Sequence, residues 1–418
     1  MLFAGLYFAE GAPIGFLWWA LPVWLRSDGR SPGEIARLTA WLAWPWALKF
    51  LWAPLVDLVR GPRFGLRAWI VASQVGMALT LVPLLFLDFG ADVDLLLWVL
   101  LLHAVTAATQ DASIDTLAVR MLSPTERGAV NGWMQVGMLG ARGLFGGGAV
   151  LLAAALGPGG RDAVVLLLVL SILSTAVLAW LGGRGSTGIE RPRGERTAAY
   201  LAGLSDLLGR RELWIGFLYA AVAGAGFEGL ASLAGPLLLD HGVAEESVGD
   251  LFLVPTVLAM GTGALLGGWA SDRLGRRRVV LLGEGLAALT VVAVGAVVWT
   301  GGGNASRELL VALLLVLYLA AGIATAALYA LLMELTRPAV AATQFCVFMA
   351  AINLCYVWST RLLGELVDRL GYGPAIVAVG SVSVLALPAI GLLRPAATTP
   401  SLDGTDQIEL EKSSKSPR

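Results

Sequence analysis

Charged residues are scarce in this sequence, and their scarcity argues against a soluble protein. Only 14% of the 418 residues are Asp, Glu, Lys or Arg, whereas soluble domains average about 25%. Hydrophobic residues make up 57% of the chain. The formal net charge of −1 gives no electrostatic reason to expect nucleic acid as a partner. The composition therefore predicts a protein whose main partner is a lipid bilayer.

Cysteine is almost absent, and so are the short motifs of common enzymes. Cys346 and Cys355 are nine residues apart, which at about 100° per residue places them on opposite faces of a helix. We expect neither a disulfide nor a metal site from them, and no cofactor. The sequence contains no G-x-x-x-x-G-K-[ST] or H-E-x-x-H motif, so it predicts neither an ATP-driven pump nor an enzyme.

Long apolar runs dominate the sequence instead. A helix needs roughly 20 residues to cross a hydrocarbon core of about 30 Å. Twelve runs are long enough, so the sequence predicts an all-α integral membrane protein with twelve transmembrane helices. The runs lie near residues 2–25, 35–58, 67–88, 95–120, 128–155, 161–182, 212–239, 247–270, 277–299, 308–335, 340–363 and 373–394.

Basic residues are distributed unevenly between the loops on the two sides. The even-numbered loops and the tail contain 20 Lys and Arg residues, and the odd-numbered loops contain six. Loops rich in Lys and Arg remain in the cytoplasm. We therefore expect a multi-pass protein of the cell membrane with both termini cytoplasmic.

A long polar interruption divides the chain into two blocks of six helices. We expect an N-terminal bundle over 1–182, a cytoplasmic linker over 183–211, a C-terminal bundle over 212–394 and a disordered tail over 395–418. The blocks resemble repeats, because Asp57 corresponds to Asp272 at an offset of about 210 residues, as parallel six-helix repeats require. Two small-xxx-small pairs also predict close helix contacts. They are Gly143 with Gly147 and Gly263 with Gly267.

The stretch GGWASDRLGRRR, residues 267–278, resembles the G-x-x-x-D-R-x-G-R-R loop signature of the major facilitator superfamily. The resemblance implies two six-helix halves that rock about a central site. An aspartate and a glycine turn at a helix end would hold arginines against a neighbouring helix terminus, as a latch on one state. The expected gating residues are Gly268, Asp272, Arg273, Gly275, Arg276 and Arg277, with Asp57 as the first-half counterpart.

Three further stretches resemble the AmpG-type muropeptide permeases. They are LKFLWAPLVD (48–57), ATQDASIDTLAVRMLSPTERG (108–128) and AATQFCVFMAAINL (341–354). The resemblance implies proton-driven import of a muropeptide or related amino-sugar peptide across the bacterial inner membrane. The neighbouring siderophore permeases of the RhtX/FptX kind and the acetyl-coenzyme A transporters suggest other substrates. An alternative of another class is a membrane sensor or scaffold that transports nothing.

Among the acidic residues within the apolar runs, four draw attention by their depth or spacing, because an ionised side chain near the centre of a bilayer costs at least about 2.5–3.5 kcal/mol. Asp111 and Asp115 share one helix face because they are four residues apart, so we expect one of the two to hold a proton. Glu10 lies beside Gly11, and Glu228 lies in the glycine-rich stretch GAGFEGLAS. These four acids are the candidates for proton coupling. An alternative is that the aspartates form permanent ion pairs with Lys49 or Arg142.

Further polar and aromatic residues are candidates for contact with a small-molecule substrate. Arg142 suits a carboxylate or phosphate, because its guanidinium binds such groups bidentately. The six candidates are Arg142, Lys49, Gln135, Asn131, Trp44 and Trp46. The alternatives are hydrogen bonding between helices for the polar residues and packing for the tryptophans. We expect protons as the coupling partner and, as a separate prediction, a monomer.

Overall fold

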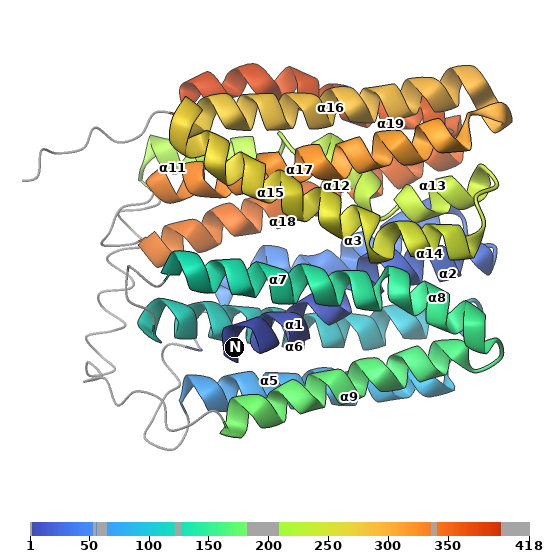
Figure 1. The fold of residues 1–418 in the computed structure, drawn as a ribbon, viewed down its shortest axis with the longest axis vertical. Helices are drawn as coiled ribbons and strands as arrows, with labels where there is room; N and C mark the ends of the chain where they lie inside the picture. The colour runs from blue at the N-terminus through green and yellow to red at the C-terminus, as the bar shows by residue number, and fades with distance from the viewer. Residues whose placement is uncertain are drawn as a thin grey trace, which may run out of the picture.

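The fold is known from a computed structural model that describes residues 2–52, 56, 65–121, 127–181, 209–335 and 341–393. All regular secondary structure in these ranges is helical (Figure 1). Each of the twelve predicted runs is mostly helical over its described residues. The predicted all-α class is therefore confirmed.

The N-terminal half places six helical segments side by side, several of them built from shorter pieces. The second segment begins at a capping box, in which the Ser31 side chain accepts a hydrogen bond from the backbone N–H of Glu34 and Pro32 starts the helix. The elements are α1 (Leu2–Gly15), the π-helical η1 (Phe16–Ala20), α2 (Leu21–Ser27), α3 (Pro32–Leu48), η2 (Lys49–Leu51), α5 (Leu66–Leu81), η3 (Val82–Phe86), α6 (Val93–Met121), α7 (Arg127–Phe145), α8 (Gly147–Leu156) and α9 (Gly160–Leu181).

The C-terminal half repeats this plan, and its first segment is broken. The break at residues 221–224 bends α11 against α12 by 45°. The elements are α11 (Arg211–Ala220), α12 (Ala225–Ala231), α13 (Ala234–Asp240), α14 (Glu245–Leu253), α15 (Pro255–Leu274), α16 (Arg276–Gly301), η4 (Gly302–Asn304), α17 (Arg307–Leu335), α18 (Ala341–Leu370), α19 (Tyr372–Ala386) and η5 (Leu387–Leu392).

Nine helices in the described ranges are long and apolar enough to span a membrane, or ten if the bent pair α11 and α12 counts as one span. Most described residues of the first two predicted runs, which contain Glu10 and Lys49, are also helical, and these runs lie outside that count. The chain is a multi-pass membrane protein.

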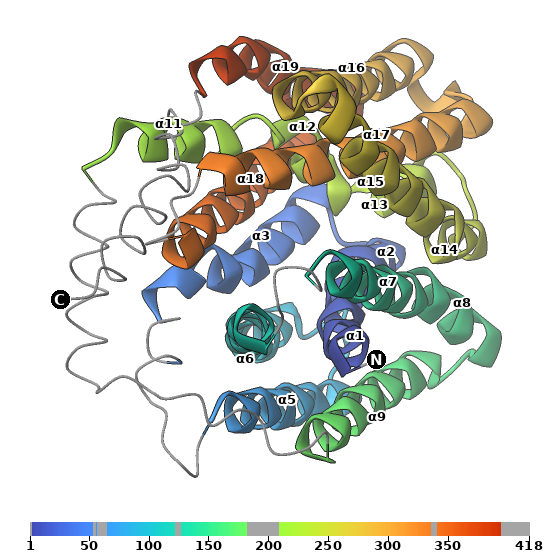
Figure 2. The same ribbon diagram turned by 60° about the vertical axis from the view of Figure 1, so that its left-hand side comes forward.

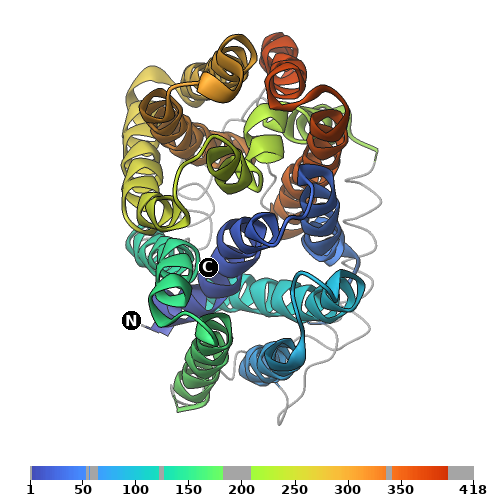
Figure 3. The same ribbon diagram turned by 90° about the vertical axis from the view of Figure 1, so that its right-hand side faces the viewer.

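The two halves lie one above the other in Figures 1 and 3, with the N-terminal half coloured blue to green and the C-terminal half yellow-green to red. The helix α3 packs against α18, and α7 and α8 pack against α14 and α15. Glycine permits this second contact, because a Cβ on Gly147 would collide with the backbone of Gly249 and Leu253. Gly143 likewise faces the backbone of Leu253.

The predicted small-residue contacts are therefore confirmed for both pairs. Gly143 and Gly147 let α7 and α8 approach the opposite half, whereas Gly263 and Gly267 let α15 approach α17 within the C-terminal half. The last two glycines lie against the backbone of Leu319 and Ile323.

Hydrogen bonds join the two halves at the end of the molecule that carries α2 and α13 (Figure 1). The Arg26 Nε donates to Asp240 Oδ1 at 2.7 Å, and Ser27 donates to Glu245. Nearby, Asp368 accepts hydrogen bonds from the Ser31 hydroxyl and the Gly33 backbone N–H, both at 3.0 Å. These contacts hold the halves together at the end where the sequence predicts the outer loops.

Candidate functional site

A buried lysine lies at the end of α3 and faces both aspartates of α6. Lys49 is 5% exposed, and its Nζ lies 2.6 Å from Asp111 Oδ2 and 3.9 Å from Asp115 Oδ2. One lysine reaches both carboxylates because the two are one helical turn apart. Figure 2 shows α6 lying between α1, α3 and α5. The sequence left Lys49 and Arg142 open as partners of Asp111, and the structure places Lys49 there.

The helix α1 adds two more polar side chains to this group. The Tyr7 hydroxyl donates a hydrogen bond to Asp115 Oδ1 at 2.8 Å. Glu10, one turn further along, is 7% exposed, and its Oε2 has no hydrogen-bond partner among the described residues. The charge of Glu10 lies within electrostatic reach of Asp111, Asp115 and Lys49. We call these five residues, Tyr7, Glu10, Lys49, Asp111 and Asp115, the acidic cluster.

The acidic cluster contains more acids than bases. Glu10, Asp111 and Asp115 would bring three negative charges, and Lys49 brings one positive charge. An uncompensated charge away from water is costly, so full ionisation of the cluster is unfavourable. The group is therefore suited chemically to accept or release a proton.

Arg142 lies apart from the acidic cluster and faces the other half. Its guanidinium lies 4.5 Å from the centroid of the Trp19 ring, as in a cation–π contact, and its Nε has no hydrogen-bond partner within the described ranges. The carboxylate that interacts with it electrostatically is Glu228 on α12, across the boundary between the halves. Arg142 is thus a cation with unused donors, opposite a glutamate of the other half.

The other predicted substrate contacts are more widely distributed. Gln135 is exposed on α7. Asn131 also belongs to α7, and its side chain lies outside the described residues. Trp46 is buried and packs edge-to-face on Trp18 at a centroid distance of 5.4 Å. Trp44 packs against a small cluster formed by Ala43, Ala231, Tyr356 and Val357, which brings both halves together.

The gating motif lies at the junction of α15 and α16. Gly275 has a φ of +87°, which a side chain would disfavour, and it ends α15. Arg276 then reaches α17, where its Nη1 lies 3.1 Å from Glu334 Oε2 and 3.3 Å from the carbonyl oxygen of Ala330. Arg273 stacks 4.2 Å from the Trp269 ring centroid.

The remaining motif positions differ in their surroundings. Asp272 is exposed, and a side chain on Gly268 would meet open space. The Nη2 of Arg277 is buried without a hydrogen-bond partner in the described part of the chain. Asp57, the first-half counterpart, lies outside the described residues. The gating role of this motif stays a prediction.

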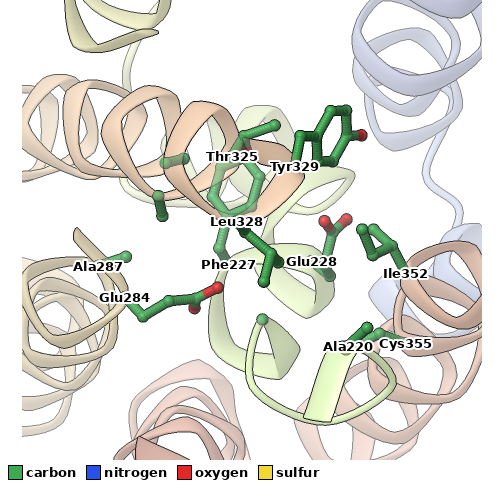
Figure 4. A pocket seen from close by; sticks show the side chains of 13 residues that line it. Ala220, Phe227, Glu228, Glu284, Ala287, Thr325, Leu328, Tyr329, Ile352 and Cys355 are labelled. Atoms are coloured by element: carbon green, nitrogen blue, oxygen red, sulfur yellow. The ribbon is translucent and has the colours of Figure 1, made fainter. Parts of the chain in front are cut away.

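Two residues of interest, Tyr7 and Glu284, were not predicted from the sequence. Tyr7 has no distinguishing sequence signal, because only the fold brings it to Asp115. Glu284 on α16 is 6% exposed and lines a cavity together with Glu228 (Figure 4). Its signal is a lone acid between two glycines, GEG, inside an apolar run. The same reasoning that selected Glu10 and Glu228 applies to it.

Comparison with known proteins gives one family and several relatives. The sequence profile of the Major Facilitator Superfamily matches residues 3–354 and 220–417. The chain is similar to the anhydromuropeptide permease of Escherichia coli K12, with 26% identity over 381 residues that cover 88% of this chain and 74% of that protein. It is also similar to the putative transporter AmpG 4 of Rickettsia conorii, with 23% identity over 403 residues that cover 92% and 93%.

The fold is likewise similar to solved transporter structures. Superposition on the D-xylose–proton symporter gives a TM-score of 0.73, with 14% sequence identity and coverage of 96% of this chain and 98% of that chain. At this identity the likeness concerns the fold alone.

Proposed function

The chain belongs to the Major Facilitator Superfamily and is a membrane transporter rather than an enzyme, and we propose that it couples the import of a small polar solute to protons. The proposed solute is a muropeptide or a related amino-sugar peptide. The proposed location is the bacterial inner membrane, with both termini in the cytoplasm and a monomer as the working unit.

The acidic cluster is the observation that carries the proton coupling. Asp111 and Lys49 are both buried and lie 2.6 Å apart, while Asp115 and Glu10 add two acids without a second base among the described neighbours. Removing an ion from water costs several kcal/mol, so the cluster is most stable with a proton on one acid. A proton that enters or leaves would change the charge that Lys49 has to balance.

Arg142 is the proposed anchor for an anionic group of the solute. Its guanidinium can bind a carboxylate through two parallel hydrogen bonds. Stacking on Trp19 keeps the guanidinium in place, and its Nε is free among the described residues. Glu228 interacts with the same cation from the other half. A solute carboxylate would therefore take the place of the Glu228 carboxylate as the partner of Arg142.

The contacts between the halves support alternating access. Arg26–Asp240 and Ser31–Asp368 would hold the outer end closed, and opening that end would require both contacts to break. At the inner end, the gating motif around Gly275 and Arg276 would hold the halves closed while the outer end is open. This arrangement is that of two halves rocking about a central site.

The resemblance to the anhydromuropeptide permease supports the choice of solute. A peptide stem offers carboxylates for Arg142, and the excess of acids over bases disfavours a solute with several phosphates, such as an acyl-coenzyme A. We therefore propose that the substrate is a small solute with few negative charges.

Proton uptake into proteoliposomes tests the proposal. We would measure external alkalinisation on adding anhydromuramyl peptides, ferric siderophores or simple sugars, with wild type, Asp111→Asn and the exposed control Glu365→Gln. We expect one solute class to drive alkalinisation in wild type and the control, and Asp111→Asn to abolish it while solute binding survives. Full coupling in Asp111→Asn would make Asp111 a packing residue and would refute the proposed role of the cluster.

A further inference from the structure

The C-terminal half contains a small cavity that is separate from the acidic cluster. The cavity has a volume of about 60 Å³. It lies beside the break between α11 and α12 and is also lined by α16, α17 and α18. Liquid water occupies about 30 Å³ per molecule, so the cavity has room for water, provided that polar groups are there to bind it.

Two carboxylic acids supply polar groups on different sides of this cavity. Glu284 extends from α16 toward its middle, and Glu228 lies on the wall formed by α12 (Figure 4). Thr325 and Tyr329 on α17 add hydroxyl groups to the lining. Most other lining residues are small or apolar, so the carboxyls are the groups that set the chemistry of the cavity.

Glu284 lacks a partner that would stabilise it as an anion. It is 6% exposed, and within the described ranges its carboxyl makes neither a hydrogen bond nor an ion pair. No basic side chain is among the described residues that line the cavity. Arg142 interacts electrostatically with Glu228 from outside the cavity and does not interact with Glu284.

The titratable groups that face Glu284 come from four elements. They are Tyr219 on α11, Glu228 on α12, Tyr329 on α17 and Cys355 on α18. From α15 and α19, no titratable side chain lines the cavity in the described part of the chain. All four groups are neutral or negative, so none of them can neutralise a carboxylate at Glu284.

We propose that Glu284 is a second proton-binding site of this transporter, in the C-terminal half, joined to Glu228 through the cavity between them. A buried acid without a cation is stable only when it holds a proton. Water in the cavity would let that proton pass between the two carboxyls. The inference rests on the proposed proton coupling and adds to it a second site that lies in the opposite half from the acidic cluster.

The two sites would behave differently during the transport cycle. Glu228 faces Arg142 across the boundary between the halves, so rocking of the halves changes the distance between these two charges. Glu284 and Glu228 belong to the same half and keep their cavity between them. Glu284 would then take up the proton that Glu228 releases when Arg142 comes close.

Infrared spectroscopy tests the site without any solute. A protonated carboxyl in apolar surroundings gives its own C=O stretching band. Spectra of purified wild type, Glu284→Gln and Glu308→Gln would be recorded over a pH series. The Glu308 control also replaces a carboxyl with an amide, but in an exposed position at the start of α17. We expect a band that persists to neutral pH in wild type and in the control and is lost in Glu284→Gln.

An unchanged band in Glu284→Gln would overturn the proposal. If that variant does not yield monodisperse protein, Glu284→Asp keeps the carboxyl and moves it, so the band should shift in frequency, and an unshifted band would equally refute the site. In proteoliposomes, Glu284→Gln should transport with one proton fewer per solute. Full coupling in Asp111→Asn, combined with a band that is lost in Glu284→Gln, would refute the proposed role of the acidic cluster alone.

Discussion

Lys49 lies between two acids of one helix, with its Nζ 2.6 Å from Asp111 Oδ2 and 3.9 Å from Asp115 Oδ2. The lysine comes from the end of α3, a helix whose other end is held to the C-terminal half through Ser31 and Asp368. The ion pair and the contact between the halves thus lie at opposite ends of α3. A change in charge at Lys49 can act on the helix that packs on α18.

Replacing Lys49 tests how strongly the acids depend on it. Lys49→Met leaves Asp111 buried without its cation, and breaking a buried pair in this way typically costs about 3–5 kcal/mol. The double variant Lys49→Met/Asp111→Asn removes both charges and should recover much of that loss. Thermal unfolding of purified protein measures both. Strictly additive losses would mean that the two side chains do not interact.

Arg142→Lys tests whether the geometry of the guanidinium matters or only its charge. A lysine keeps the charge and loses both the bidentate fork and the planar stack on Trp19. We expect the KM for a carboxylate-bearing solute to rise about tenfold, which corresponds to about 1.4 kcal/mol, with a smaller change in kcat. Solute-dependent uptake over a concentration series gives both constants. An unchanged KM would remove Arg142 from the binding site.

Arg26→Ala tests the contact that closes the outer end. An ion pair of this exposure is worth about 0.2–1 kcal/mol, so its loss should shift the population toward an open outer end by up to about fivefold. Spin labels on Asp162→Cys and Ser247→Cys, which are exposed positions in opposite halves, would report the distance after Cys346 and Cys355 are replaced. We expect a larger long-distance population in Arg26→Ala. Identical distance distributions would show that the pair does not hold the end closed.

Gly147→Ala tests the close approach between the halves. The added Cβ would meet the backbone of Gly249 and Leu253, and overpacking of this kind costs about 1–3 kcal/mol. Gly140→Ala is the matched control, since a Cβ there meets no atom within 4 Å and should stabilise the helix by up to about 1 kcal/mol. Unfolding temperatures in detergent should move in opposite directions. Parallel shifts would argue against a tight contact at Gly147.

Much of the fold could be predicted because the information is local in the chain. Apolar length predicted the helices, and all twelve predicted runs are mostly helical over their described residues. Spacing predicted that Asp111 and Asp115 share a face, and both do face Lys49. Glycine spacing predicted close contacts for Gly143 with Gly147, though not which helices they meet. The match to the Major Facilitator Superfamily confirmed the family that the loop motif suggested.

The sequence by itself determined that this is a helical membrane protein with two halves and several acids in unusual places, because hydropathy and helical period depend only on neighbours along the chain. The tertiary structure alone decided which charges meet. Lys49 rather than Arg142 faces Asp111, Tyr7 reaches Asp115, and Glu284 shares a cavity with Glu228. Each of these pairs joins different helices, and their distances follow from how whole helices pack, which no local pattern records.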